Sequence, residues 1–101
     1  PKTSYSLFDV YGNLIKQTRW HSSHREAISG LSFDPRGQKI ALIDEANHLS
    51  VLDVTTDQVV LEREFSGRKN YYIKCRWNPK AENMIAIKDG DGVHFYDIEK
   101  Q

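Results

Sequence analysis

The sequence of 101 residues predicts an all-β fold in which one four-stranded antiparallel unit is repeated along the chain. The first observation is a repeat: three similar segments end in Asp9-Val10, Asp53-Val54 and Asp97-Ile98, and their aspartates lie 44 residues apart (53 − 9 and 97 − 53). The second is an alternation of apolar and polar residues with a period of two, which is typical of strands. The third is the concentration of Gly, Pro, Asn and Asp between the alternating runs, where turns are expected.

A second set of segments repeats at the same interval. Phe33–Pro35 matches Trp77–Pro79, and the two prolines are 44 residues apart (79 − 35). The apolar run that starts at Ile40 matches the run that starts at Ile85 with an offset of 45 (85 − 40), so one residue has been added in the turn before it. Loops tolerate changes in length whereas strand register does not, so an insertion confined to a turn supports repeated strands.

The positions of the strands follow from the alternation and the turns. Alternating runs surround Leu31 and Cys75, and turn-forming clusters at 35–37, 55–57 and 89–92 separate neighbouring runs. No run of ten residues has its apolar positions at helical spacing. We therefore expect nine strands, at residues 4–10, 14–20, 27–34, 39–44, 48–54, 58–65, 71–78, 84–88 and 92–98.

The repeat resembles that of the WD40 family. A period of about 40–45 residues is shared by the helical armadillo and HEAT repeats, but the alternation indicates strands. In WD40 repeats a His precedes the innermost strand and an aromatic residue follows nine positions later, as His24 and Phe33 do here. The matching residues are Ser23, His24, Ile28, Leu31 and Phe33 in one repeat and Gly67, Arg68, Tyr72, Cys75 and Trp77 in the next.

The resemblance implies a β-propeller fragment with antiparallel four-stranded blades, one complete blade being flanked by two partial blades. Blade strands are named A to D from the inside to the outside, and the nine strands then read C-D, A-B-C-D and A-B-C. Residues 1–20 would be the end of a blade, 21–66 a complete blade and 67–101 most of the next blade.

The family pattern also implies structural roles and shows departures. His24 would take the place of the family's conserved His, and Asp9, Asp53 and Asp97 the place of the Asp in its Trp-Asp dipeptide, although the Trp itself is replaced in all three repeats. In the family a buried hydrogen-bonded network joins that His to a turn Asp, the Trp and a hydroxyl of strand B. Strand B offers alanines here, Ala41 and Ala86, so we expect that this network cannot assemble and that apolar packing must replace it.

No catalytic, cofactor or metal site is expected. Cys75 alternates with apolar residues and is interpreted as a small core residue. His21 and His24 are three residues apart without further ligands nearby, which is a weak zinc signal. The segment 89–92 (Asp-Gly-Asp-Gly) lacks the later Glu of an EF-hand loop and is interpreted as a hairpin turn. Nucleophile elbows and phosphate-binding loops are absent from the sequence, so we expect that the chain is not an enzyme.

Composition limits the partners and the compartment. Fourteen Lys and Arg balance fourteen Asp and Glu, so net charge gives no reason to expect binding to nucleic acid. No stretch approaches the ~20 apolar residues needed to cross a bilayer, and we expect no membrane insertion. A single cysteine forms no intramolecular disulfide, which favours an intracellular protein, cytoplasmic or nuclear.

About two blades cannot close a ring, because propellers have 4–8 blades. Three explanations remain: the chain is a segment of a longer propeller, another chain completes the ring, or copies of this chain associate. The segment is favoured because strand C occurs three times, which end-to-end joining of copies would duplicate, and because the chain begins at Pro1 and not at Met.

The expected function is that of a non-catalytic scaffold for protein interaction, which would serve the assembly of a multi-subunit complex. Its partners would be other proteins, including the rest of its own propeller. WD40 propellers commonly bind partners on the face built by the D–A and B–C loops, here 21–26, 45–47, 67–71 and 89–92. The alternatives are the non-catalytic portion of a propeller enzyme and an RNA- or ribosome-associated propeller. Arg and Tyr are enriched in binding hot spots, and the candidate partner-binding residues are Arg25, Arg68, Lys69, Asn70 and Tyr71.

Overall fold

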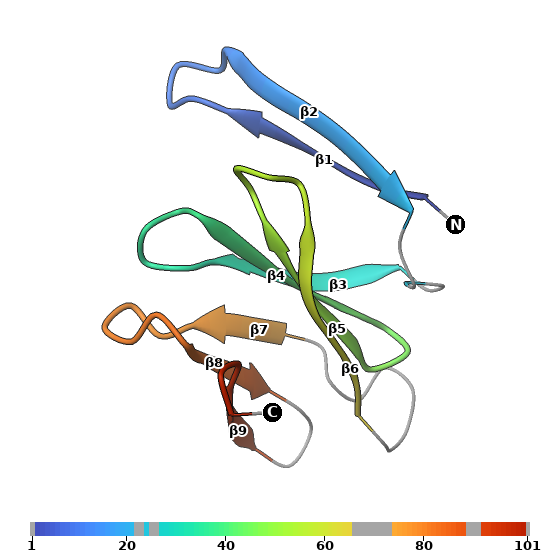
Figure 1. Cartoon of the computed structure of the whole chain (residues 1–101), viewed down its shortest axis with the longest axis vertical. Coiled ribbons are helices and arrows are strands. Elements are labelled where there is room, and N and C mark those ends of the chain that lie inside the picture. Colours follow the sequence, from blue (N-terminus) through green and yellow to red (C-terminus); the bar gives the residue numbers. More distant parts are fainter. Residues whose placement is uncertain (1, 22–23, 25–26, 66–73, 89–91, 101) are drawn as a thin grey trace.

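A computed structural model describes residues 2–21, 24, 27–65, 74–88 and 92–100 of the chain (Figure 1). Nine strands form three antiparallel sheets, which we call the first, middle and last sheets. The first sheet contains β1 (Lys2–Phe8) and β2 (Leu14–His21). The middle sheet contains β3 (Ile28–Phe33), β4 (Lys39–Asp44), β5 (His48–Asp53) and β6 (Val59–Glu64). The last sheet contains β7 (Lys74–Trp77), β8 (Met84–Lys88) and β9 (Val93–Asp97).

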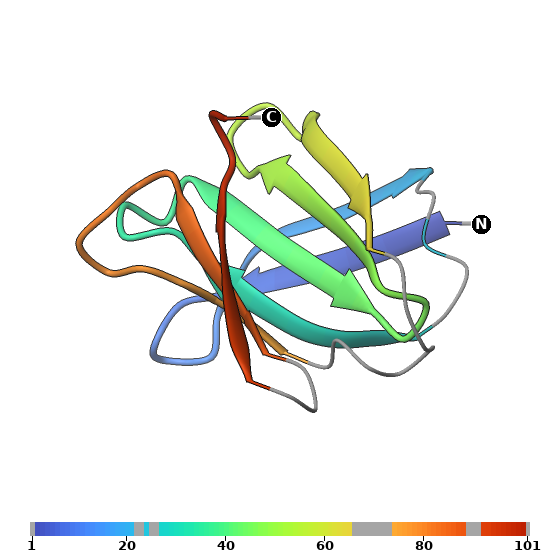
Figure 2. The same cartoon turned by 90° about the horizontal axis from the view of Figure 1, so that it is seen from below.

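The three sheets are stacked in chain order, with the middle sheet between the other two (Figures 1 and 2). Within each sheet the strands follow one another in sequence, each pairing with the next through a hairpin. Sheets of two, four and three strands confirm the predicted fold class of one complete blade between two partial ones. The division of the chain at residues 20/21 and 66/67 stays a prediction. In the described part of the chain, no helix is long and apolar enough to cross a membrane.

The first strand is shifted from its expected position at 4–10. It begins earlier and ends at Phe8, because Asp9 closes a turn directly after it. The Oδ1 atom of Asp9 accepts hydrogen bonds from the backbone N–H groups of Tyr11 and Asn13, both at 2.9 Å. Side-chain hydrogen bonds of this kind offer the backbone an alternative to strand pairing. β1 therefore ends at Phe8, directly before the aspartate whose carboxylate accepts the backbone N–H groups of the turn.

A β-bulge near the start of β3 explains an irregularity in its sequence pattern. Ile28 and Leu31 have opposite parity in a regular strand, yet both are apolar; the pairing with β4 shifts between Ile28 and Gly30. Gly30 also lies directly against β7. A Cβ atom added to it would come within 3.0 Å of the Lys74 Cα atom and 3.2 Å of the Cys75 backbone nitrogen. The close approach of the two innermost strands therefore requires glycine at this position.

Two apolar clusters hold the three sheets together. The larger one lies between the middle and last sheets and contains Ala41, Ile43, Leu49, Val51, Leu61, Cys75, Trp77, Ile85 and Ile87. The smaller one lies between the first and middle sheets, where Tyr5 and Leu7 of β1 pack on Ile40, Leu42 and Val54. One face of the middle sheet thus packs on the last sheet and the other on the first sheet, because alternate residues of a strand point to opposite faces.

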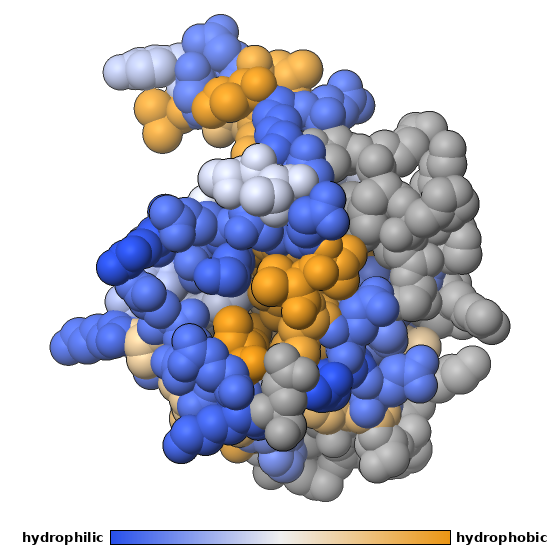
Figure 3. Space-filling model, viewed as in Figure 1, coloured by the Kyte–Doolittle hydropathy of each residue, from blue (hydrophilic) through white to orange (hydrophobic). Residues whose placement is uncertain are grey.

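Apolar side chains also remain on the surface. In the view of Figure 3 they gather over the hairpin of the first sheet and again over the middle sheet. Val10 and Tyr11 in the β1–β2 turn are almost fully exposed, and Val59 and Val60 of β6 are partly exposed.

Candidate functional site

The predicted partner-binding face is formed by loops at one end of the sheets, and the structure describes part of it. Arg25, Arg68, Lys69, Asn70 and Tyr71 all lie outside the described residues, so their assignment stays a prediction. The described part consists of His21, His24, Gly92 and the turn from Glu45 to Asn47, which joins β4 to β5.

His24 is buried at this loop end and joins two strands of the middle sheet. Its Nδ1 atom lies 2.7 Å from Asp44 Oδ2, and its Nε2 atom lies 2.6 Å from Ser50 Oγ. Both ring nitrogens of His24 therefore have a buried hydrogen-bond partner, one a carboxylate oxygen and the other a hydroxyl. A charge-assisted hydrogen bond between buried groups is among the stronger polar contacts in proteins.

Asp44 connects this histidine to the β4–β5 turn. While Oδ2 binds His24, Oδ1 accepts hydrogen bonds from the backbone N–H groups of Ala46 and His48, at 2.8 and 2.9 Å. A further backbone hydrogen bond runs from Glu45 N–H to the carbonyl of Ala27, at 3.0 Å. Two loops from different parts of the sequence are therefore held together at the same end of the blade.

This network corrects one expectation from the sequence. We expected that the buried network of the WD40 pattern could not assemble, because strand B offers Ala41 and Ala86 in place of a hydroxyl. The structure shows that His24, Asp44 and Ser50 do form a hydrogen-bonded set, and that the hydroxyl comes from β5, the C strand. The family's own network, with a strand-B hydroxyl and a Trp, does not form among the described residues. The sequence analysis missed a substitute hydroxyl on β5, which is adjacent to β4 in the sheet, with Ser50 paired with Leu42.

The sequence contains a signal for this set. Asp44 ends an apolar strand and precedes a short turn that contains Asn47, and Ser50 interrupts the apolar run Leu49–Leu52. A polar residue inside an otherwise apolar strand requires a hydrogen-bond partner when it is buried. That requirement could have identified Ser50 as a member of a buried hydrogen-bonded set, although it would not have identified His24 as the partner.

A second histidine supports the same end of the blade. The ring of His48 packs edge-on against His24, with centroids 4.8 Å apart and planes at 88°. On its other side, Nε2 lies 3.8 Å from Glu62 Oε1 and Nδ1 lies 3.6 Å from Glu64 Oε1, both on β6. The polar cluster therefore extends across β5 to the outermost strand of the middle sheet.

The three repeated aspartates act at the opposite end of the sheets. Asp9 directly follows β1, and Asp53 and Asp97 are the last residues of β5 and β9. Each accepts a backbone N–H group of the following turn: Asp9 from Asn13, Asp53 from Thr55 and Asp97 from Glu99, all at 2.9 Å. These hydrogen bonds lower the pKa of all three carboxyls from the ordinary value of 3.8; the leading contributions are the Asn13 backbone for Asp9, the Thr55 hydroxyl for Asp53 and the Glu99 backbone for Asp97. Hydrogen bonds to a carboxylate favour its charged form, which is why the pKa values fall. The three aspartates therefore cap the turns that follow them.

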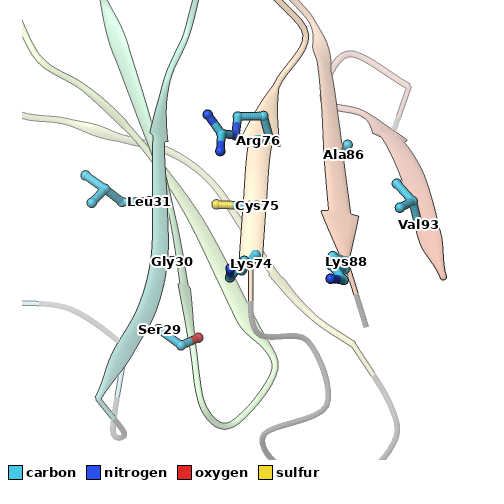
Figure 4. A pocket seen from close by; sticks show the side chains of 9 residues that line it. All are labelled: Ser29, Gly30, Leu31, Lys74, Cys75, Arg76, Ala86, Lys88 and Val93. Carbon is cyan, nitrogen blue, oxygen red and sulfur yellow. The ribbon is translucent and has the colours of Figure 1, made fainter. Parts of the chain in front are cut away.

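The described side chains contain few chemically reactive groups. Cys75 is buried between the middle and last sheets, and burial raises the pKa of its thiol to about 12. A thiol with such a pKa is neutral at physiological pH and is a poor nucleophile. Among the described residues, no group of three His, Cys, Asp or Glu side chains could hold a metal ion. A cavity of about 540 Å³ is lined by residues of β3 and of the last sheet (Figure 4), and a second one of about 740 Å³ lies near Phe33 and Trp77.

The fold has a counterpart among solved structures. No protein-family model matches the sequence, and no curated protein matches it. The β-propeller domain of Cps50 (Swd1) from Myceliophteria thermophila is similar to the chain, with a TM-score of 0.71 and 15% sequence identity. The similarity covers 96% of this chain, which spans 30% of the length of that one. The chain therefore has the fold of part of a β-propeller.

Proposed function

We propose that the chain is a non-catalytic scaffold that binds other proteins through the loop end described above and contributes to the assembly of a multi-subunit complex. The observation that carries this proposal is the His24–Asp44–Ser50 set, which joins the loop before β3 to the loop between β4 and β5. Loops that are held in place before binding lose less conformational freedom on association, and rigid support of exposed loops is typical of binding sites.

Hydrogen bonding at the two ends of the middle sheet favours the loop end as the binding site. At the end with Asp53, the carboxylate is occupied by the turn that follows it. At the loop end, the buried polar atoms of His24 and Asp44 face inward and leave Glu45 exposed at the tip. The sequence predicts that Arg25, Arg68 and Tyr71 belong to loops of this end, and these residues are of the types that dominate hot spots.

A site-specific cross-linking experiment tests the proposal. A photo-reactive amino acid is placed at Glu45, and a matched control carries it at Thr55, which is also exposed but lies at the other end of the middle sheet. In cells that produce the protein, we expect a discrete cross-linked protein from position 45 and none from position 55.

The double variant Arg68→Ala/Tyr71→Ala completes the test. We expect it to abolish the cross-link from position 45 while the melting temperature stays the same. An undiminished cross-link in the double variant, or equal cross-linking from positions 45 and 55, would contradict the assignment of the loop end as the interface.

A further inference from the structure

We propose that Asn47 is a positioning residue of the interface at the loop end: its buried side chain fixes the exposed tip of the β4–β5 turn, where a protein partner would bind. This inference deepens the proposed function and rests on it. The turn belongs to the middle sheet, which has four strands and packs on a neighbouring sheet with each of its faces. Its surroundings are therefore those of a complete four-stranded unit.

The backbone at Asn47 has a conformation that glycine adopts more readily than asparagine. Its φ is 64°, in the left-handed region, where a Cβ atom crowds the carbonyl oxygen that follows. Asparagine tolerates this region better than most residues, but glycine adopts it at no steric cost. The backbone alone favours glycine, so the gain from an asparagine at this position comes from its side chain.

The side chain of Asn47 is buried, although it lies in a hairpin turn. Turns lie on the surface, and Glu45, two residues earlier, is exposed, whereas Asn47 is 1% exposed. Burial of an amide group costs free energy unless the group is hydrogen-bonded. In the described part of the chain, Asn47 is not among the side chains that are buried without a hydrogen-bond partner. The side chain therefore anchors the turn to the buried end of the sheet.

Backbone hydrogen bonds connect Asn47 to both sides of the loop end. Its N–H group donates to the carbonyl of Asp44 at 3.2 Å, and its carbonyl accepts from the N–H group of Phe65 at 2.9 Å. Asp44 in turn binds His24. The ring of Phe65 packs edge-on against Tyr96 of the last sheet, with centroids 5.9 Å apart. Asn47 thus lies between the carboxylate that holds the loop before β3 and the residue that follows β6.

The tip of the turn, Glu45 and Ala46, is fixed at both of its ends. On one side, Oδ1 of Asp44 accepts the backbone N–H group of Ala46 at 2.8 Å. On the other side stands the buried Asn47. A tip with fixed ends loses little conformational freedom when a partner binds. Glycine at position 47 would remove the buried anchor and add backbone freedom, so it would weaken binding while strand pairing is kept.

Asp57 provides a matched comparison at the other end of the middle sheet. It is the other described non-glycine residue in the left-handed region, with a φ of 60°, and it lies in the turn between β5 and β6. Its side chain is 40% exposed and forms an ion pair with Lys16 of the first sheet. Asp57→Gly therefore makes the same change in the backbone as Asn47→Gly, but at a turn without a buried anchor.

The first test measures binding with the photo-reactive amino acid at Glu45, in cells that produce the protein. Asn47→Gly and Asp57→Gly are each combined with it. We expect Asn47→Gly to reduce the yield of the cross-linked protein at least about fivefold and Asp57→Gly to leave it unchanged. The melting temperatures of the two variants are expected to agree within about 4 °C, because the backbone effects are the same. A purely structural role would lower the melting temperature of Asn47→Gly together with the yield.

The second test needs no partner. Amide hydrogen exchange, followed by mass spectrometry on the purified protein, reports how firmly the turn is held. We expect exchange in the segment 44–48 to be at least about tenfold faster in Asn47→Gly and unchanged in Asp57→Gly. Faster exchange throughout the middle sheet would show that Asn47 supports the whole sheet and not the turn.

Three results overturn the assignment: an undiminished cross-link in Asn47→Gly, unchanged exchange of the segment 44–48 in that variant, and loss of folding in Asn47→Gly alone. In each of these cases a cross-link from position 45 in protein that retains Asn47 leaves the proposed function standing. Absence of that cross-link contradicts the proposed function instead, and the exchange comparison then decides separately whether Asn47 fixes the turn.

Discussion

The two contacts of the middle sheet use the same repeat positions in different ways. Cys75 and Trp77 on β7 are 6% and 3% exposed in the contact between the middle and last sheets. Their equivalents 44 residues earlier, Leu31 and Phe33 on β3, are 56% and 42% exposed, on the face that is directed toward the first sheet. The residues are of similar type, so the difference lies in what stands opposite them.

The opposing surfaces explain the difference. β7 lies directly against β3 of the middle sheet, as the 3.0 Å approach to Gly30 shows. The first sheet consists of β1 and β2 alone, the C and D strands of its blade, and their apolar residues reach only the outer part of the middle sheet. Innermost strands therefore cover innermost strands, and among the described strands none of that kind lies opposite the apolar residues Leu31 and Phe33 of β3.

The contact with the first sheet depends more on polar groups. Lys16 Nζ lies 2.7 Å from Asp57 Oδ1 and also donates to the Val54 carbonyl, and the Tyr5 hydroxyl lies 3.1 Å from the same Asp57 atom. The contact with the last sheet has a continuous apolar cluster. Apolar burial contributes more to stability than exposed ion pairs, so we expect the contact between the middle and last sheets to be the more stable of the two.

The largest expected effect comes from truncating one aromatic residue in each contact. Trp77→Ala removes a buried ring whose Nε1 donates to the Glu82 carbonyl at 2.8 Å, and we expect a loss of ~3–5 kcal/mol in the free energy of unfolding. Phe33→Ala removes a ring that is partly in water, and we expect a loss of about 1 kcal/mol. Urea unfolding followed by circular dichroism measures both. Equal losses would show that Phe33 is covered in solution and would break the comparison.

A smaller effect is expected from the close approach of β3 and β7. Gly30→Ala places a Cβ atom against the backbone of Lys74 and Cys75, which cannot move without displacing β7, and we expect a loss of ~1–3 kcal/mol. The matched control is Lys74→Ala at the equivalent position of the last sheet, an exposed residue for which we expect a change within about 0.5 kcal/mol. An unchanged stability of the Gly30 variant in the same urea experiment would mean that the two strands are not in close contact.

The smallest effect is expected at the polar contact of the first sheet. Hydrogen bonding to Asp57 raises the pKa of Lys16 above its ordinary value of 10.5. A raised pKa means that the contribution is fully present below pH 10.5 and is lost as pH rises through the folded pKa. We therefore expect Lys16→Gln to lower the melting temperature slightly at neutral pH, and the difference to shrink at 1 M salt and as the pH rises above 10.5 through the raised pKa of Lys16. A difference that persists at high salt would identify packing of the lysine stem as the cause.

Much of the fold was predictable, because a strand repeat leaves its period in the sequence. The expected strands 39–44 and 84–88 agree with β4 and β8 residue for residue. The first strand was displaced, since the capping action of Asp9 decides where pairing ends. Only one member of the buried network was predicted, because the position of His24 followed from the repeat. Its hydroxyl partner Ser50 comes from an adjacent strand. Local sequence does not indicate which residues of adjacent strands will meet.

The sequence by itself determined the period, the alternation and the turns, and these define three antiparallel sheets in chain order. Local residue type and spacing are sufficient for that, because hydrogen bonding within a hairpin involves neighbours along the chain. Only the tertiary structure decided which repeated residues are buried. Leu31 and Cys75 occupy the same place in their repeats, and the difference between them is the presence of an innermost strand opposite Cys75 and its absence opposite Leu31 among the described strands. Burial depends on what a neighbouring sheet places there, and that is a property of packing and not of sequence position.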